Sequence, residues 1–237
     1  MTRDACRAQL RGMAEEGYRQ FSSALLPGVA GIIGVRLPAL KKLAAGLVKA
    51  GEWEEWLAGY FAADERWFEE DMLAGFVIAA AKIPPEARIP LVRRFLPRVG
   101  NWSVCDSFCA ALKDAAKRRE CYWPLIRELL DSGEEFAVRM GIVLLLDHYR
   151  APDWFDRALD AVRTAALPGY YAEMAAGWAL SIFYLDDRGK VRPLLAAGEL
   201  PERVRRIAVR KICESRRCMP EEKAELRALA AGKEARP

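Results

Sequence analysis

Hydrophobic positions recur at three- and four-residue intervals through nearly the whole chain. In the stretch EEDMLAGFVIAAAKI, Met72, Phe76, Ala79 and Ile83 follow this spacing, and EFAVRMGIVLLLDHY carries a wider apolar face. Such a period places the apolar side chains on one face of an amphipathic helix. No stretch alternates convincingly between apolar and polar residues, as a half-buried strand does. The pattern predicts an all-α protein.

Turn and capping residues interrupt the helical pattern at short intervals. They are Pro27-Gly28, Pro38, Gly51, Pro84-Pro85, Pro97, Gly100-Asn101, Pro124, Gly133, Pro152-Asp153, Pro168-Gly169, Pro201 and Pro220. These marks predict about a dozen helices of about 10 to 18 residues, joined by short turns. Because no linker is long enough to separate two domains, residues 1–237 are predicted to form a single domain.

Short helices in succession favour an α-solenoid over a single bundle, because each helix pair has two apolar faces that only its neighbours can cover. A weak internal period agrees with this arrangement. Trp102 precedes Arg139 by 37 residues, and Arg139 precedes Trp178 by 39. Both intervals are close to the HEAT-like repeat length of about 40. We therefore predict HEAT-like helical repeats curved around a concave groove, where equivalent residues of successive repeats face the same surface.

The composition is typical of a soluble protein with a sizeable core. The chain has 237 residues, of which 52% are hydrophobic and 30% charged. No apolar run approaches the roughly 18 residues that a membrane span needs. Six cysteines without repeated paired spacings indicate reduced thiols and a cytoplasmic protein. The net charge of +4 is weakly basic, but the charge is unevenly distributed, because residues 188–217 contain ten Lys or Arg and only three Glu.

Several kinds of chemistry find no support in the sequence. The chain has one histidine, His148, which argues against Ser-His or Cys-His catalysis and against multi-histidine metal sites. Cys105 and Cys109 lie one helical turn apart, but no further thiol or histidine is spaced to complete a metal site. Neither a GxGxxG segment nor a P-loop is present. The sequence therefore predicts no metal and no cofactor.

The segment NWSVCDSFCAAL places an acid among residues that usually belong to a core. On a helix, Trp102 and Asp106 lie one turn apart, with Cβ atoms about 5 to 6 Å from each other. The indole shields the carboxylate partly from water, which makes it a stronger partner for a cation and a better base. The structural alternative is that Asp106 binds backbone amides or an arginine in an internal ion pair.

Other candidate residues also have two interpretations. Trp178 follows the small residues of AAGW, so its ring is either open to stacking or part of the core. Arg139 interrupts the apolar run FAVRMGIVLLL and needs an anion, either Asp106 or a phosphate. A group of basic residues also has two interpretations, either a solvated helix face or a DNA-binding surface. These residues are Arg203, Arg205, Arg206, Arg210 and Lys211.

One acidic and aromatic stretch, GEWEEWLAGYFAADERWFEED, is interpreted as structural. Its rings fall at helical spacings, which core packing explains for most of them. Its two final glutamates, Glu69 and Glu70, are expected on a solvated helix face.

Taken together, several segments resemble the AlkD-like DNA alkylation repair family, whose fold is a curved array of HEAT-like repeats. The resemblance runs from about Gly34 to Arg217 and includes NWSVCDSF, which is similar to the Trp-x-x-x-Asp motif of that family. The other matching segments are GVRLPALKKLA, WFEEDMLAGFVIAAA, VRMGIVLLLDHY and GWALSIF. Their order and spacing also match, which is more specific than any one segment alone.

The resemblance implies a DNA glycosylase that removes cationic alkylpurines, such as 3-alkyladenine and 7-alkylguanine, without flipping the base into a tight pocket. By this resemblance Asp106 stabilises positive charge on the deoxyribose and aligns a water molecule. Trp102 and Trp178 hold the sugar and backbone, and Arg139 binds a phosphate.

Three departures from the family leave the activity open. Asp147 replaces a lysine and Ser181 replaces an arginine, which should weaken binding to DNA. The segment FSSALLPGVAGII, with Leu25 and Leu26, is expected to lack the aromatic residue that the family supplies from an N-terminal helix. Two alternatives are therefore a non-catalytic protein that binds branched or distorted DNA and a scaffold whose groove holds a protein helix. Nothing in the sequence demands more than a monomer.

Overall fold

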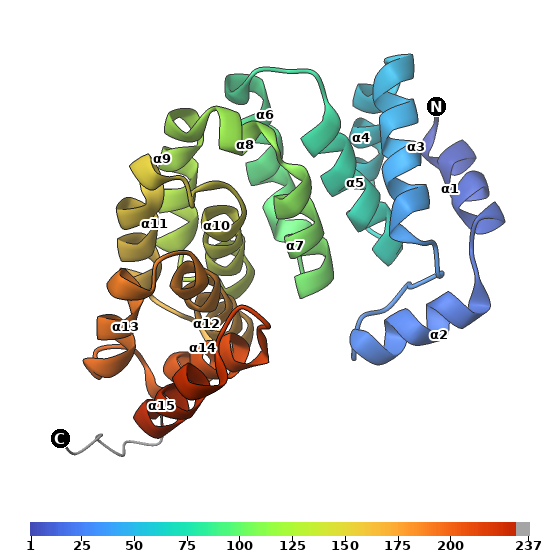
Figure 1. The fold of residues 1–237 in the computed structure, drawn as a ribbon. Helices are drawn as coiled ribbons and strands as arrows, with labels where there is room; N and C mark the ends of the chain where they lie inside the picture. The colour runs from blue at the N-terminus through green and yellow to red at the C-terminus, as the bar shows by residue number, and fades with distance from the viewer. Residues whose placement is uncertain (231–237) are drawn as a thin grey trace. The chain divides into compact units, whose positions relative to one another are not determined.

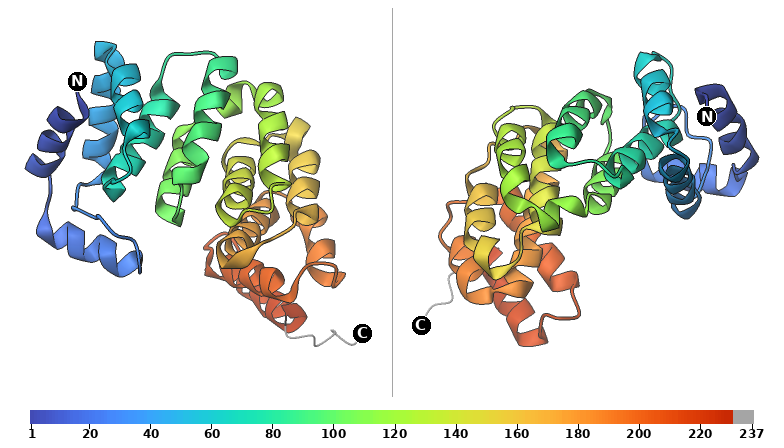
Figure 2. Two further views of the ribbon diagram at one scale, coloured as in Figure 1. Left: turned by 180° about the vertical axis from the view of Figure 1, so that it is seen from behind. Right: turned by 90° about the horizontal axis from the view of Figure 1, so that it is seen from above.

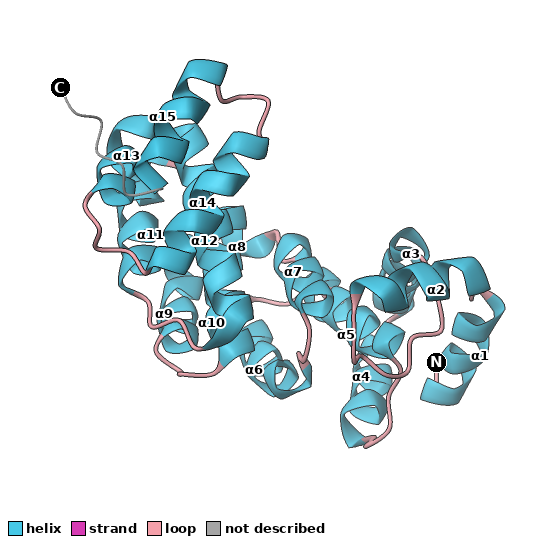
Figure 3. Cartoon of the chain, turned by 90° about the horizontal axis from the view of Figure 1, so that it is seen from below, coloured by secondary structure: helices cyan, strands magenta, loops and turns pink. Residues whose placement is uncertain are grey.

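The computed structural model describes residues 1–230, and every regular element within that range is helical (Figure 1, Figure 3). Fifteen α-helices and one short 3-10 helix make up this part of the chain, which confirms the prediction of an all-α fold. None of these helices is both long and apolar enough to cross a membrane.

The chain divides into two compact units, of which the first is Met1–Arg118 and the second begins at Arg119. The helices of the first unit are α1 (Arg3–Gly12), α2 (Glu16–Leu25), α3 (Leu37–Ala50), α4 (Trp53–Ala62), α5 (Phe68–Ala80), α6 (Pro85–Phe95), the 3-10 helix (Leu96–Arg98), α7 (Trp102–Ala111) and α8 (Asp114–Lys117). The helices of the second unit are α9 (Arg119–Leu130), α10 (Glu135–His148), α11 (Pro152–Thr164), α12 (Gly169–Asp186), α13 (Arg188–Ala196), α14 (Glu202–Glu214) and α15 (Pro220–Ala230).

In each unit, three helices pack side by side in a row. In the first unit α3 packs against α5 and α5 against α7, and in the second α10 packs against α12 and α12 against α14 (Figure 1, Figure 2). The intervening helices pack on these rows, for example α4 on α3 and α5, and α11 on α10 and α12. Successive helix pairs of this kind make an α-solenoid of helical repeats. The single domain and the curved groove stay predictions.

Most helix boundaries follow the turn and capping residues. Asn101 caps α7, since its side-chain oxygen accepts a hydrogen bond from the Val104 amide at 3.0 Å. Gly51 ends α3 with a left-handed backbone, φ 74°. The number of helices exceeds the predicted dozen because five breaks lack such marks: those between α1 and α2, α4 and α5, α7 and α8, α8 and α9, and α12 and α13. One mark, Pro124, lies inside α9 and ends no helix.

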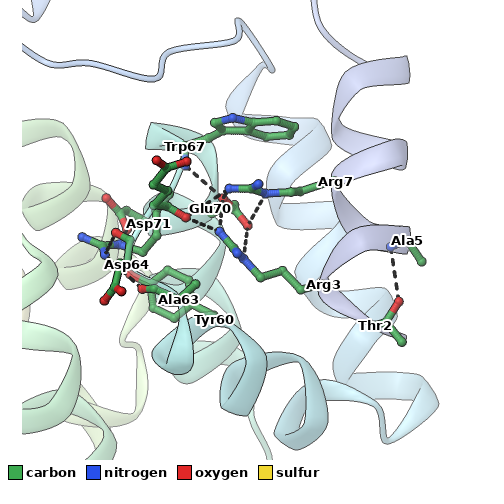
Figure 4. A network of polar contacts seen from close by, with 12 residues as sticks. Thr2, Arg3, Ala5, Arg7, Tyr60, Ala63, Asp64, Trp67, Glu70 and Asp71 are labelled. Atoms are coloured by element: carbon green, nitrogen blue, oxygen red, sulfur yellow. Dashed lines mark hydrogen bonds and ion pairs between the residues drawn. The ribbon is translucent and has the colours of Figure 1, made fainter.

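The prediction that Glu69 and Glu70 lie on a solvated face is wrong, because both side chains are buried, each at 1% exposure. Glu70 forms ion pairs with Arg3 and Arg7 of α1, each at 2.7 Å (Figure 4). Burial alone raises the pKa of Glu70, but the hydrogen bonds from Arg7 and Arg3 outweigh it and hold the pKa below its usual value. The N-terminal helix is thus fastened to the first turn of α5.

Candidate functional site

Helix α7 has a core face and a half-buried face, and the candidate acid lies on the second. The core face consists of Val104, Cys105, Phe108 and Cys109. The half-buried face carries Trp102, Ser103, Asp106 and Ser107. The Asn101 cap starts the helix immediately before Trp102, and the helical period then brings Asp106 to the same face one turn later. Asp106 is therefore not buried in the core, although its apolar neighbours in the sequence are.

A pocket with a volume of about 240 Å³ lies beside Trp102 within the first unit. Its walls come from α2, the segment before α3, the first residues of α3 and α5, and the first two turns of α7. The lining residues are Tyr18, Phe21, Ser22, Leu25, Leu26, Val35, Leu37, Phe68, Trp102, Ser103 and Ser107. The pocket therefore combines aromatic and aliphatic walls with several hydroxyl groups, which suits a flat, partly polar ligand.

The expectation that the N-terminal segment supplies no aromatic residue is wrong. Phe21 and Tyr18 of α2 line the pocket together with Trp102, and Phe21 is 59% exposed. Leu25, at 49% exposure, continues the same wall. The signal is present in the sequence, because positions 18, 21 and 25 share one face of a helix. The prediction considered only Leu25 and Leu26, and so missed the aromatic residues one and two turns earlier.

In the second unit, Arg139 is buried at the junction of α10 and α12. The side chain is 6% exposed, and its Nη1 donates a hydrogen bond to the carbonyl oxygen of Tyr171 at 2.8 Å. The amide of Tyr171 in turn donates to Glu135 Oε1 at 2.6 Å, which ties the start of α12 to the start of α10. The predicted partner of Arg139 was Asp106 or a phosphate, and the structure shows that its guanidinium also has a backbone acceptor.

Trp178 is half-buried on α12, next to Gly177, where α12 and α14 are in close contact. A Cβ atom on Gly177 would lie 2.5 Å from Ile207 Cγ2 and 3.0 Å from the Val204 carbonyl oxygen, so a glycine is needed at this contact. Ser181 faces inward at 2% exposure and donates to the Trp178 carbonyl oxygen at 2.6 Å. Close packing on both sides therefore fixes the backbone that carries the indole.

The basic residues of α14 occupy its solvent-facing side, opposite the buried Val204, Ile207 and Val209. Most are ion-paired at the surface, with Arg203 to Glu173 at 3.0 Å and Lys211 to Glu214 at 2.9 Å. Arg206 pairs with Glu202, and Arg210 lies 3.9 Å from Glu214. Arg205 is half-buried. Exposed pairs of this kind contribute little to stability, so exchanging a carboxylate for a phosphate costs little.

The structure brings the predicted residues together in two groups, one in each unit. Trp102 and Asp106 share one face of α7 in the first unit. Arg139, Trp178 and the basic face of α14 lie on the packed row of the second unit. Across residues 1–230, no cluster of three His, Cys, Asp or Glu side chains is arranged to hold a metal ion.

The fold is that of an all-helical repeat protein, in which the first unit carries an acid beside an indole ring and the second carries an indole ring and arginines. The model of the family described as DNA alkylation repair enzyme matches residues 6–212. Because this match covers most of the chain, the protein belongs to that family, which confirms the resemblance. Its function is thus DNA alkylation repair, and DNA is the partner that this function implies. Searches of curated proteins and of solved structures found no match.

Proposed function

We propose that the protein is a DNA glycosylase that hydrolyses the N-glycosidic bond of cationic alkylpurines, with Asp106 as the catalytic carboxylate. The observation that carries this proposal is the face of α7, where Asp106 lies half-buried one turn after Trp102, on a helix that lines a pocket. Membership of the DNA alkylation repair family supports it.

The chemistry needs few groups, because the lesion is already activated. A purine alkylated at N3 or N7 carries a positive charge, so the C1′–N bond breaks with its electron pair passing to the base, which leaves uncharged. Positive charge then develops on the deoxyribose, and a nearby carboxylate stabilises it. Water adds to C1′ and releases its proton, and Asp106 is placed to orient that water. The products are the free base and an abasic site.

The remaining residues bind the DNA around the reacting sugar. The exposed part of the Trp102 ring and that of Trp178 offer flat surfaces for the sugar-phosphate backbone. Arg139 and the basic face of α14 supply contacts to phosphates. Since these contacts hold the backbone, the enzyme acts without drawing the lesion into a tight pocket, unlike base-flipping glycosylases.

The alternative is a non-catalytic protein that recognises branched or distorted DNA by its backbone. Two observations favour it: Asp147 places a negative charge on α10, and Ser181 faces inward rather than toward a ligand. The family resemblance implies that members which excise bases carry a cation at each of these two positions. Fewer phosphate contacts reduce affinity for a linear duplex, while a differently shaped substrate can still be bound.

A base-release assay distinguishes the two functions. A duplex with one 7-methylguanine is incubated with excess protein, and strand cleavage at the abasic site is followed over time. We expect release by the wild type, and a rate about 10² to 10³ lower for Asp106→Asn. Asp131→Asn, which removes an exposed carboxylate of the second unit, is the matched control and should keep the wild-type rate.

The same assay decides against the glycosylase if excess wild-type protein leaves the lesion intact. Gel shifts at a stated salt concentration, with a four-way junction and a linear duplex, then test the alternative. Tighter binding to the junction supports it, and failure to bind either DNA excludes it.

A further inference from the structure

Helix α2 forms a wall of the pocket, yet little of it is buried. Among its residues only Ser22 is buried, whereas Phe21 and Leu25 are largely exposed. A surface ion pair between Glu15 and Arg36, at 2.8 Å, joins its start to the start of α3. Since exposed pairs are weak, a further contact must keep α2 at the pocket.

That contact is a buried carboxylate on α5. Glu69 accepts hydrogen bonds from three successive backbone amides: Gly34 at 2.7 Å, Ile33 at 3.0 Å and Val35 at 3.2 Å. Burial raises the pKa of Glu69 above its usual value, and the three amides oppose that rise. The segment 33–35 joins α2 to α3, so Glu69 fixes the link that carries α2.

The link passes this constraint to α2 through Gly34. The carbonyl oxygen of Gly34 accepts a hydrogen bond from the Glu15 amide at 3.0 Å, at the start of α2. Gly34 has a φ of +90°, and a Cβ atom there would lie 2.4 Å from the Glu15 carbonyl oxygen and 2.8 Å from the Arg19 nitrogen. The backbone of Gly34 is thus in direct contact with the first turn of α2.

We propose that Glu69 is a positioning residue, which sets the pocket wall formed by Tyr18, Phe21 and Leu25 without touching the ligand. The inference rests on the proposed function, since it takes the pocket beside Trp102 as part of the DNA-binding site. Glu69 is 1% exposed and therefore acts only through the segment 33–35. A preformed wall binds more tightly, because the ligand does not have to order α2 first.

The chain contains a matched control for this proposal. Glu70 is the next residue of α5 and equally buried, but it holds Arg3 and Arg7 of α1 instead of the segment before α3. The α1 helix does not line the pocket. Glu69→Gln and Glu70→Gln therefore remove the same charge from neighbouring positions, and only the first should affect α2.

The first measurement is hydrogen exchange of the DNA-free protein. In Glu69→Gln the amide oxygen can still accept from the segment 33–35, but the new NH2 group replaces the second oxygen, which accepts from the Ile33 amide at 3.0 Å, and the charge that strengthens all three hydrogen bonds is lost. We expect exchange in residues 16–25 and 33–35 to rise about tenfold, and exchange in residues 3–12 to stay unchanged. Glu70→Gln should show the reverse pattern. Equal exchange of α2 in both variants overturns the proposal.

The second measurement separates binding from chemistry on duplex DNA that contains 7-methylguanine. We expect the dissociation constant of Glu69→Gln to rise about threefold to tenfold, while the single-turnover rate at saturation stays within about twofold of the wild type. Glu70→Gln should leave both values unchanged. An unchanged dissociation constant in Glu69→Gln, despite faster exchange of α2, also overturns the proposal.

A second variant covers the case in which Glu69→Gln does not fold, as judged by circular dichroism. Gly34→Ala disturbs the same junction from the side of the link, and we expect the same faster exchange of α2 and the same weaker binding. Wild-type exchange of α2 in Gly34→Ala contradicts the proposal. Because the exchange experiments contain no DNA, they test the role of Glu69 even if the wild type releases no base and the proposed function fails.

Discussion

The two units of the molecule hold their candidate residues by different interactions. In the first, buried carboxylates of α5 fasten neighbouring segments: Glu69 binds the link to α2, which lines the pocket, and Glu70 binds Arg3 and Arg7 of α1 with little exposure to water. In the second, Gly177 lets two helices of the packed row approach closely, and ion pairs such as Arg203 with Glu173 lie at the surface.

This difference matters for function. A wall that is fastened by a few polar contacts can be loosened by one substitution or by a change of pH, because each buried contact is expensive to lose. A close-packed helix row responds to changes in volume and hardly to changes in charge. We therefore expect the pocket beside Trp102 in the first unit to be adjustable, and the helix row that carries Arg139 and Trp178 in the second unit to be rigid.

The sharpest test of the packed row is a methyl group at the close contact between α12 and α14. In Gly177→Ala the new Cβ would lie 2.6 Å from Ile207 Cβ, so the two helices must separate. We expect a loss of about 2 kcal/mol in the free energy of unfolding, measured by urea denaturation.

Gly46→Ala in α3 is the control, because a Cβ atom there meets nothing within 4 Å. It should raise the free energy of unfolding by up to about 1 kcal/mol through helix propensity alone. Similar effects of the two substitutions would contradict close packing at Gly177.

The second test compares two carboxylates, one in each unit, whose pKa lies below its usual value although burial raises it. Hydrogen bonds from Arg7 and Arg3 lower the pKa of Glu70, and those from Tyr184, Cys218 and Arg188 lower that of Glu222. Glu70→Gln should lower the free energy of unfolding by about 2 kcal/mol at neutral pH, less than for a fully buried pair because Arg3 and Arg7 are partly exposed. Glu222→Gln, which breaks an ion pair with the more exposed Arg188, should lower the free energy of unfolding by less than about 1 kcal/mol. Urea denaturation of both variants measures the difference.

The pH dependence gives the sign of the effect. A carboxylate with a lowered pKa stabilises the fold above its unfolded pKa, and this contribution is lost as the pH falls through the lower folded value. Wild-type stability should thus decrease as the pH falls below about 4.5, and Glu70→Gln should flatten that decrease. An equally steep decrease in the variant would show that Glu70 is not the group responsible.

The smallest expected effect concerns the surface of the second unit. If the basic face of α14 contacts phosphates, Arg206→Gln and Arg210→Gln should each reduce the salt slope of DNA binding by about 0.9. Fluorescence anisotropy at several salt concentrations measures this slope. Lys49→Gln, an exposed cation of α3 in the first unit, is the control, and an equal change there would mean that α14 has no special role.

The sequence predicted those features that depend on local pattern. Period and punctuation indicated an all-α repeat protein, and the spacing of Trp102 and Asp106 placed them on one helix face, because neighbours in sequence determine both. The roles of Glu69 and Glu70 were not predictable in this way. Their partners lie more than 30 and 60 residues away, and the periodicity of α5 carries no information about them.

The α2 wall is an intermediate case. The apolar positions 18, 21 and 25 were visible as a helix face, but the sequence did not show that this face turns toward Trp102, since a tertiary hydrogen bond to Gly34 determines its direction. The partner of Arg139 was likewise open, because a backbone carbonyl is an acceptor that no side-chain pattern reveals.

Glu69 and Glu70 are successive residues of one α-helix, so their side chains leave the helix axis about 100° apart. This angle lets a single turn of α5 hold α1 in one direction and the link to α2 in another. Inserting or deleting one residue of α5 directly after Glu70 would rotate both carboxylates together relative to the core face of the helix and detach two segments at once. The register of this first turn relative to the core face of α5 therefore controls two attachments together.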